Sequence, residues 1–291
     1  CPGRHHLARH GCRHRCPLRA GIVHAVVGAP VAQRFVIHQL LTAEGVEHAP
    51  RHRGRGGRLC RLPFCNTLEA EALGAVVRLD ERGARVPQPP YASLSELPAQ
   101  FCLNSSRIDA VLGAVSTLAE QGLCVAYGAT GVFTIFSQLL PMGAFFKALR
   151  RDDGQALLRR MEQACVDYAV RARRAGARIL SYADPVATVD IVGQRTFTTH
   201  VAPGIVRLFD SIRHQCPDMT IFLCGKMTQS LLDTGAVQCT AVPVGEGLNF
   251  EQALLQAAED EHAQIWGLGC LNRLSAPCRA LYRLDFLQGA K

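Results

Sequence analysis

The sequence of 291 residues lacks several features that mark common classes of protein. It has no run of eighteen apolar residues free of charge, so we expect no membrane-spanning segment. It has neither a start methionine nor a signal-peptide pattern, so nothing supports secretion. No GxGxxG opens a βαβ unit and no Walker loop occurs, which disfavours dinucleotide-binding and P-loop folds. A hydrophobic content of 48% with 6% aromatic residues is typical of a soluble globular protein.

Acidic residues are nearly absent from the first 61 positions. This segment holds eleven arginines and eight histidines but only two acids, Glu44 and Glu47, so its net charge is +9. Residues 62–291 carry a net charge of −1, so the overall charge of +8 belongs to one end of the chain. Nucleic-acid binding needs a basic face interleaved with aromatics or a known module. Neither occurs, and we expect no nucleic-acid partner.

The composition of residues 1–61 is unusual for a folded domain. A basic disordered tail and a translation in the wrong frame are both consistent with it. The alternation His10-Cys12-His14-Cys16 matches no zinc spacing set by a knuckle or a helix, so we expect no metal there. We therefore predict a basic His/Arg-rich segment over 1–61 and one folded domain over 62–291.

The sequence has thirteen cysteines, an odd number, and most of them lie in apolar segments. Such thiols usually behave as small buried hydrophobes. The pattern therefore indicates free thiols in a reducing cytoplasm rather than a disulfide framework.

Apolar strands alternate with helical segments from residue 122 onward. We expect strands at 123–127, 177–182, 219–223, 237–242 and 264–268, and one more helix after Ala276. This alternation is typical of a parallel sheet, either a barrel or a doubly wound sheet. We predict an α/β fold, a (β/α)₈ TIM barrel that is incomplete or irregular at its N-terminus.

Side chains capable of chemistry follow these strands. In α/β barrels the carboxyl ends of the strands form the rim that carries the active site. The residues that we expect on this rim are Cys65, Asn66, Glu69, Glu71, Gly128–Gly131, Tyr182, Asp184, Cys224, Lys226 and Cys270. Two thiolates with one oxygen or nitrogen ligand would form a three-ligand catalytic zinc site, which activates a bound thiol or water. The alternative is that Cys224 and Cys270 are inert, and that Lys226 is a solvated surface residue.

Four segments resemble one family. They are PFCNTLEAEALGA (63–75), SYADPVATVDIVG (181–193), FLCGKMTQSLL (222–232) and GLGC (267–270). Through them, residues 62–272 are similar to the uroporphyrinogen decarboxylase-like superfamily, and most of all to its methylcobamide:coenzyme M methyltransferase branch. The resemblance implies a (β/α)₈ barrel.

The same resemblance implies a zinc site, held in that branch by a His-x-Cys-Gly motif and a later cysteine. Cys224 and Cys270 match the two thiol positions, but Phe222 stands at the histidine position. Asp184 and Glu69 are the candidates for the missing ligand. The implied reaction is attack by a zinc-bound acceptor thiolate on the methyl group of a methylcobamide, with cobalt leaving as Co(I). A separate corrinoid protein is the implied partner, and Lys226 and Gly225 are expected to contact the cofactor or substrate.

Two further interpretations stay open. A uroporphyrinogen decarboxylase would bind a tetrapyrrole through a carboxylate near the pyrrole nitrogens, a role for Asp184. Tyr182 would lie beside it, because the two residues alternate along the strand end. The replacement of histidine by Phe222 also favours an inactive relic that binds a tetrapyrrole or a corrinoid.

Overall fold

A computed structural model describes residues 59–63, 65–80, 83–260 and 264–287 of the chain. The contacts divide the chain into residues 1–48 and 49–291, and all described residues belong to the second unit. Most of the predicted basic segment therefore lies outside the described residues. The first strand begins at Leu59, within the segment predicted to be a tail.

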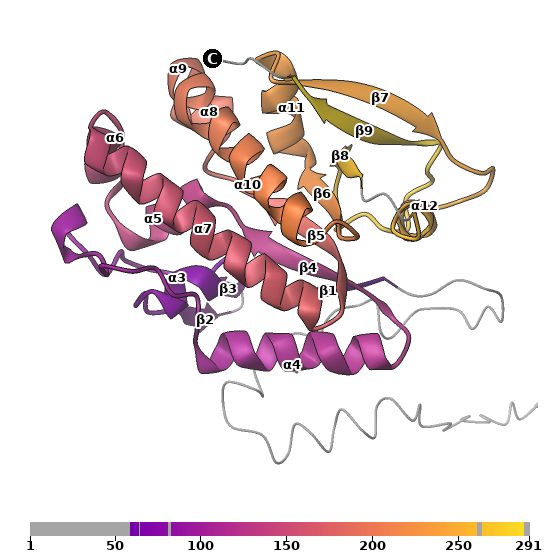
Figure 1. Cartoon of the computed structure of the whole chain (residues 1–291), viewed down its shortest axis with the longest axis horizontal. Coiled ribbons are helices and arrows are strands. Elements are labelled where there is room, and N and C mark those ends of the chain that lie inside the picture. The colour runs from indigo at the N-terminus through magenta and orange to yellow at the C-terminus, as the bar shows by residue number, and fades with distance from the viewer. Residues whose placement is uncertain (1–58, 64, 81–82, 261–263, 288–291) are drawn as a thin grey trace, which may run out of the picture. The chain divides into compact units, whose positions relative to one another are not determined.

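A seven-stranded mixed sheet forms the centre of this unit (Figure 1). In spatial order its strands are β1 (Leu59–Leu62), β4 (Cys124–Thr130), β5 (Ala177–Ala183), β6 (Thr220–Cys224), β8 (Ile265–Gly269), β9 (Ala280–Phe286) and β7 (Val237–Pro243). The first five strands in this order, β1, β4, β5, β6 and β8, are parallel to one another, as the alternation of strands and helices predicts. The strand β9 pairs antiparallel with β8 on one side and with β7 on the other.

The long helix α7 (Asp152–Arg174) illustrates why the segments between strands are helical. Two aspartates lie in its first turn and three arginines in its last, so both ends complement the helix dipole. Its buried residues recur every three or four positions, which gives one apolar face. The other helices are α3 (Leu68–Ala72), α4 (Ser106–Glu120), α5 (Val132–Leu139), α6 (Met142–Leu149), α8 (Val189–Val192), α9 (Gln194–Thr196), α10 (Ala202–Gln215), α11 (Gly225–Asp233) and α12 (Phe250–Ala257). A 3₁₀ turn (Leu94–Glu96), a π-helical turn (Phe197–Val201) and the hairpin of β2 (Arg78–Asp80) and β3 (Gly83–Arg85) complete the described elements.

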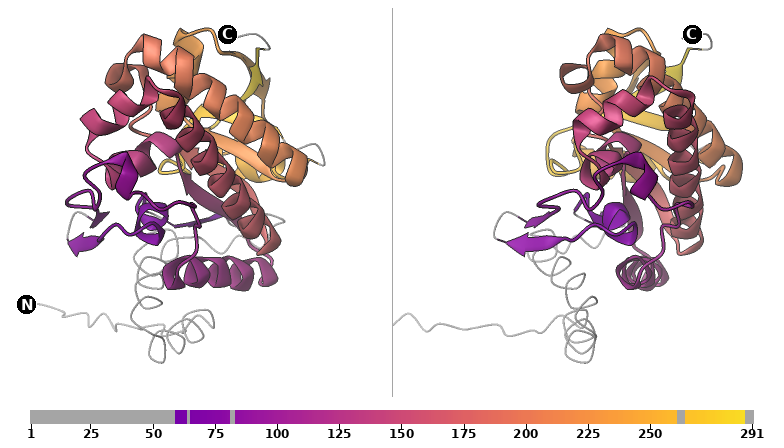
Figure 2. Two further views of the ribbon diagram at one scale, coloured as in Figure 1. Left: turned by 60° about the vertical axis from the view of Figure 1, so that its left-hand side comes forward. Right: turned by 90° about the vertical axis from the view of Figure 1, so that its left-hand side faces the viewer.

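Helices cover both faces of the sheet. Figures 1 and 2 show α4, α7 and α10 on one face, where Tyr127 of β4 makes an edge-to-face contact with Tyr168 of α7. On the other face, Phe222 of β6 contacts Phe250 of α12 in the same manner, with ring centroids 5.5 Å apart. Since successive side chains of a strand point to opposite faces, the parallel strands bury side chains on both sides, and their sequences are mostly apolar.

The end of the chain departs from the predicted order. The helix predicted after Ala276 is wrong, because residues 280–286 form β9 and pair with β7 over its full length. Leu281 and Leu284 are buried in this strand, and its backbone hydrogen bonds are met by neighbours on both sides. As a result β6 pairs directly with β8, and β7 lies at the edge of the described sheet. None of the helices in the described part of the chain combines the length and apolar character needed to cross a bilayer.

Candidate functional site

The carboxyl ends of the parallel strands meet at one edge of the sheet. Here β4 ends at Thr130, β5 at Ala183, β6 at Cys224 and β8 at Gly269. Most of the predicted site residues lie in or directly after these strand ends. They fall into two groups, carboxylates near β4 and β5 and thiols near β6 and β8.

The carboxylate of Asp184 anchors the start of helix α5. Its Oδ1 accepts hydrogen bonds from the backbone N–H and the hydroxyl of Thr134, at 2.9 and 2.7 Å, and its Oδ2 accepts one from the N–H of Phe133 at 3.0 Å. The residue is 3% exposed. Burial raises the pKa of Asp184, and the bonds from Thr134 and Phe133 limit that rise. A side chain at Gly131 would collide with this carboxylate, which explains the glycine at that position.

Glu69, on helix α3, anchors the end of β4 in the same way. It accepts hydrogen bonds from the backbone N–H of Thr130 at 2.9 Å and from the hydroxyl of that residue at 2.6 Å. Its side chain is buried, and burial raises the pKa of the carboxyl. Glu71 points elsewhere and pairs with Arg107, so the two glutamates do not share a face, as predicted from their spacing.

Tyr182 lies in the core and not on the rim. Its ring makes an edge-to-face contact with Phe209 of α10, with centroids 5.3 Å apart. Only 3% of the residue is exposed, and burial raises the pKa of its hydroxyl well above the usual value. The structure therefore places Tyr182 among the residues that join the sheet to its helices.

Cys224 and Cys270 lie on neighbouring strand ends. Cys224 is opposite Gly269 in the pairing of β6 with β8, and Cys270 is the next residue. Cys224 is half-buried and Cys270 is exposed, and both are free thiols. The structure thus brings together two thiols that are 46 positions apart in the sequence, as the parallel arrangement predicts.

The backbone around these thiols is irregular. The register of β6 and β8 shifts between Phe222 and Cys224, and Leu268 has a φ of 56°, in the left-handed region that a leucine rarely adopts. A Cβ at Gly225 would lie 3.1 Å from the carbonyl oxygen of Gly269, so this glycine permits the close approach of the two strand ends. Bulges and strained residues of this kind are concentrated at functional sites. Lys226 lies in the first turn of α11 and has an exposed side chain.

Arg61 is a site residue that the sequence analysis assigned to the basic segment. It belongs to β1, and its Nη1 donates a hydrogen bond of 2.8 Å to Oδ1 of Asn272, which follows Cys270 closely in the chain. Its Nε is buried with no hydrogen-bond partner among the described residues. Burial lowers the pKa of the guanidinium, whereas Cys270 and Cys224 lie near enough to raise it. The signal in the sequence is a single charge inside the apolar strand LCRL, hidden by the arginine-rich residues before it.

A zinc site with three protein ligands does not fit the described residues. A catalytic zinc ion takes three such ligands, and no group of three or more histidine, cysteine or acidic side chains is placed for a metal in the described part of the chain. Phe222 is 1% exposed and packs on Phe250. The oxygens of Asp184 and Glu69 are already bonded to the loops that they anchor. Two thiols remain, with a guanidinium beside them.

The fold and this sheet edge are typical of a known α/β family. Residues 58–267 match the uroporphyrinogen decarboxylase (URO-D) family, and the chain belongs to that family. The predicted family and fold class are thereby confirmed, although the described strands form an open sheet rather than a closed barrel.

Three relatives give the family membership more detail. The methylcobamide:CoM methyltransferase MtaA of Methanosarcina barkeri is 27% identical over 209 residues, which are 68% of this chain and 59% of MtaA. The methylcobamide:CoM methyltransferase MtbA of Methanosarcina mazei is 23% identical over 233 residues, covering 74% of this chain and 68% of MtbA. The solved structure of a methyltransferase from Methanosarcina mazei has the same fold, with a TM-score of 0.57 and 23% identity over 74% of this chain and 64% of that one. The chain thus spans less than two thirds of the length of MtaA.

Proposed function

We propose that the chain transfers a methyl group from a methylated corrinoid to a thiol acceptor at the strand ends that carry Cys224 and Cys270. The observation that carries this proposal is the pairing of β6 with β8, which places Cys224 and Cys270 on neighbouring strand ends at a strained edge of a URO-D-family sheet. Similarity to two methylcobamide:CoM methyltransferases supports the same reaction. The methyl donor would be carried by a separate corrinoid protein.

Arg61 would bind the acceptor in this reaction. Its guanidinium is close to both thiols, and one of its buried N–H groups has no partner among the described residues. A buried donor of this kind is usually satisfied by a ligand or by water. An acceptor with an anionic group would satisfy it and would neutralise the buried charge. In the transfer, the acceptor thiol would release its proton to solvent and attack as a thiolate. Its S–C bond would form as the cobalt–carbon bond of the donor breaks, and the electron pair of the broken bond would stay on the donor corrinoid.

The zinc part of the prediction has less support than the methyl transfer. Two thiols supply two of the three ligands that such a site needs, and Phe222 leaves the third position apolar. We expect this chain to bind zinc weakly, and no step of the proposed transfer depends on the metal.

The decarboxylase interpretation loses the residue on which it was based. Asp184 was to face the pyrrole nitrogens, but its oxygens already accept bonds from Phe133 and Thr134. The carboxylate is buried at the start of α5 and has no free oxygen directed at a substrate.

The experiment is a methyl-transfer assay on the full chain under anaerobic conditions. Methylcobalamin serves as the donor, and the acceptors are coenzyme M and the neutral thiol 2-mercaptoethanol. We expect loss of the methylcobalamin absorbance with coenzyme M, at a higher kcat/KM than with the neutral thiol. Absence of transfer to either thiol, together with decarboxylation of uroporphyrinogen, would reject the proposal in favour of the second activity. Absence of both activities would favour an inactive relic.

A further inference from the structure

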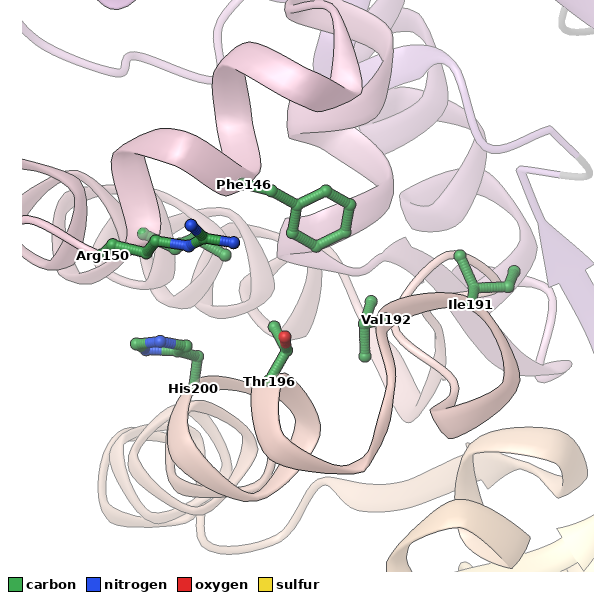
Figure 3. A pocket seen from close by; sticks show the side chains of 7 residues that line it. Phe146, Arg150, Ile191, Val192, Thr196 and His200 are labelled. Atoms are coloured by element: carbon green, nitrogen blue, oxygen red, sulfur yellow. The ribbon is translucent and has the colours of Figure 1, made fainter.

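A cavity of about 320 Å³ lies between helix α6 and the helical run from α8 to the π-helical turn before α10 (Figure 3). It shares no lining residue with the edge that carries Cys224 and Cys270. Pockets for small ligands usually have volumes of about 300–1,000 Å³. The cavity therefore has room for a small molecule and is separate from the proposed transfer site.

The lining of the cavity changes in character from one end to the other. Figure 3 shows Ile191 and Val192 at one end, Arg150 and His200 at the other, and Phe146 above the gap between them. Val192 is buried, whereas Ile191 is 55% exposed, and few large apolar side chains among the described residues are as exposed. An apolar body bound at this end would cover the Ile191 side chain.

The polar end offers one positive charge and two neutral hydrogen-bonding groups. Arg150 has no ion pair among the described residues, while its neighbour Arg151 pairs with Asp153. Burial lowers the pKa of His200, so its imidazole is neutral at neutral pH and has one N–H to donate. The hydroxyl of Thr196 lies between these groups and Val192 (Figure 3). None of the residues lining the cavity is acidic.

The backbone that carries the polar end of the cavity has an unusual conformation. Thr196 ends α9, and His200 lies in the π-helical turn Phe197–Val201 that follows it. Gly193, with a φ of 77°, separates this run from α8. Single π-helical turns are rare and occur frequently at functional sites. The irregular turn is therefore a second observation, independent of the cavity, at the same residues.

We propose that this cavity binds a small organic carboxylate with an apolar body. The carboxylate pairs with the guanidinium of Arg150, whose planar fork matches two carboxylate oxygens. Thr196 and His200 donate the remaining hydrogen bonds, and the apolar body lies on Phe146, Val192 and Ile191. A monoanion fits better than a phosphate because only one lining residue is permanently charged. This site is independent of the proposed methyl transfer.

The test is a titration of the full chain with hexanoate as the probe, and ligand-observed NMR measures the binding. We expect saturable binding with a Kd of about 1 mM, the range for a ligand of this size. Hexanamide has the same shape without the charge and should bind about tenfold more weakly, because charge-assisted hydrogen bonds are the stronger kind. Acetate, which lacks the apolar body, should not saturate in the same range.

Two variants locate the site. Arg150→Gln should weaken hexanoate binding about tenfold because it removes the charge, and His200→Phe about threefold because it removes the N–H donor. Arg213→Gln and His214→Phe are the matched controls, because both residues are exposed at the end of α10 and line no part of the cavity. Equal binding of hexanoate and hexanamide to the unmodified chain would overturn the proposal without any variant. Equal effects of Arg150→Gln and Arg213→Gln would overturn it as well.

Discussion

Two parts of the same sheet edge use their reactive side chains in opposite ways. At the ends of β4 and β5, the carboxylates of Glu69 and Asp184 are buried and accept hydrogen bonds from the loops beside them. At the ends of β6 and β8, the thiols of Cys224 and Cys270 are half-buried and exposed, and the Nε of Arg61 has no described partner. The carboxylates of the first part hold the loops in place. The thiols and the guanidinium of the second part are available to contact a substrate.

This difference shows what makes a residue at a strand end available for chemistry. Burial and a raised pKa are frequent at active sites, and both apply to Asp184. Its oxygens nevertheless bond to the chain itself, so its position is explained by the fold. The neighbouring thiols have no such explanation, which makes them the better candidates. The following variants test this comparison in order of expected effect.

Asp184→Ala should destabilise the protein by about 4 kcal/mol, because three buried donors on Phe133 and Thr134 would lose their acceptor at about 1–3 kcal/mol each. Urea unfolding followed by circular dichroism measures the change. Asp210→Ala, on the exposed side of α10, is the control and should change stability by less than about 0.5 kcal/mol. A loss below about 1 kcal/mol in Asp184→Ala would mean that the carboxylate is free for another role.

The Cys224→Ser/Cys270→Ser double variant should lower kcat/KM for methyl transfer about 100-fold, or about 2.7 kcal/mol. Its stability should change little, because Cys270 is exposed and Cys224 is only half-buried. The Cys102→Ser/Cys239→Ser double variant replaces one exposed and one half-buried thiol elsewhere and should keep full activity. Full activity in the first variant would remove the thiol edge from the mechanism.

Phe222→His should increase zinc affinity about tenfold, or about 1.4 kcal/mol, by adding a third ligand of the type that such sites require. Zinc titration with a competing chelator measures the affinity. Phe222→Leu is the control, since it loses the same contact with Phe250 without adding a ligand. If the unmodified chain already binds one zinc ion tightly, the conclusion that three ligands are missing is wrong.

Arg61→Gln should raise the KM for coenzyme M about fivefold, or about 1 kcal/mol, and leave the KM for 2-mercaptoethanol unchanged. The reason is that only the anionic acceptor would use the positive charge. Arg213→Gln, on an exposed position of α10, should alter neither constant. An equal increase for both thiols would assign Arg61 to support of the strand alone.

Much of the fold follows from local patterns in the sequence. The strands β4, β5, β6 and β8 and the helices between them were predicted because buried parallel strands are apolar throughout and helices repeat every 3.6 residues. The placement of β7 was not predictable in this way. Its apolar character fits any position in the sheet, and only its pairing with β9, a strand predicted as a helix, places it at the edge.

The candidate site was predictable to a smaller extent. The alternation of strands and helices was enough to bring Cys224 and Cys270 to one edge. It gave no information on which atoms are already bonded, so Asp184 and Tyr182 looked as promising as the thiols. Arg61 was missed for a different reason, because it lies within a stretch of basic residues and no periodicity marks the beginning of so short a strand as β1.

The pairing of β7 with β9 has a consequence for the order in which the chain folds as it is synthesised. The strand β8 can join β6 as soon as residues 265–269 have left the ribosome, whereas β7 is synthesised before β9, its only described sheet partner. Residues 237–243 must therefore wait for residues 280–286. A nascent chain stalled between these two segments would expose an unpaired strand, and chaperone capture should peak there.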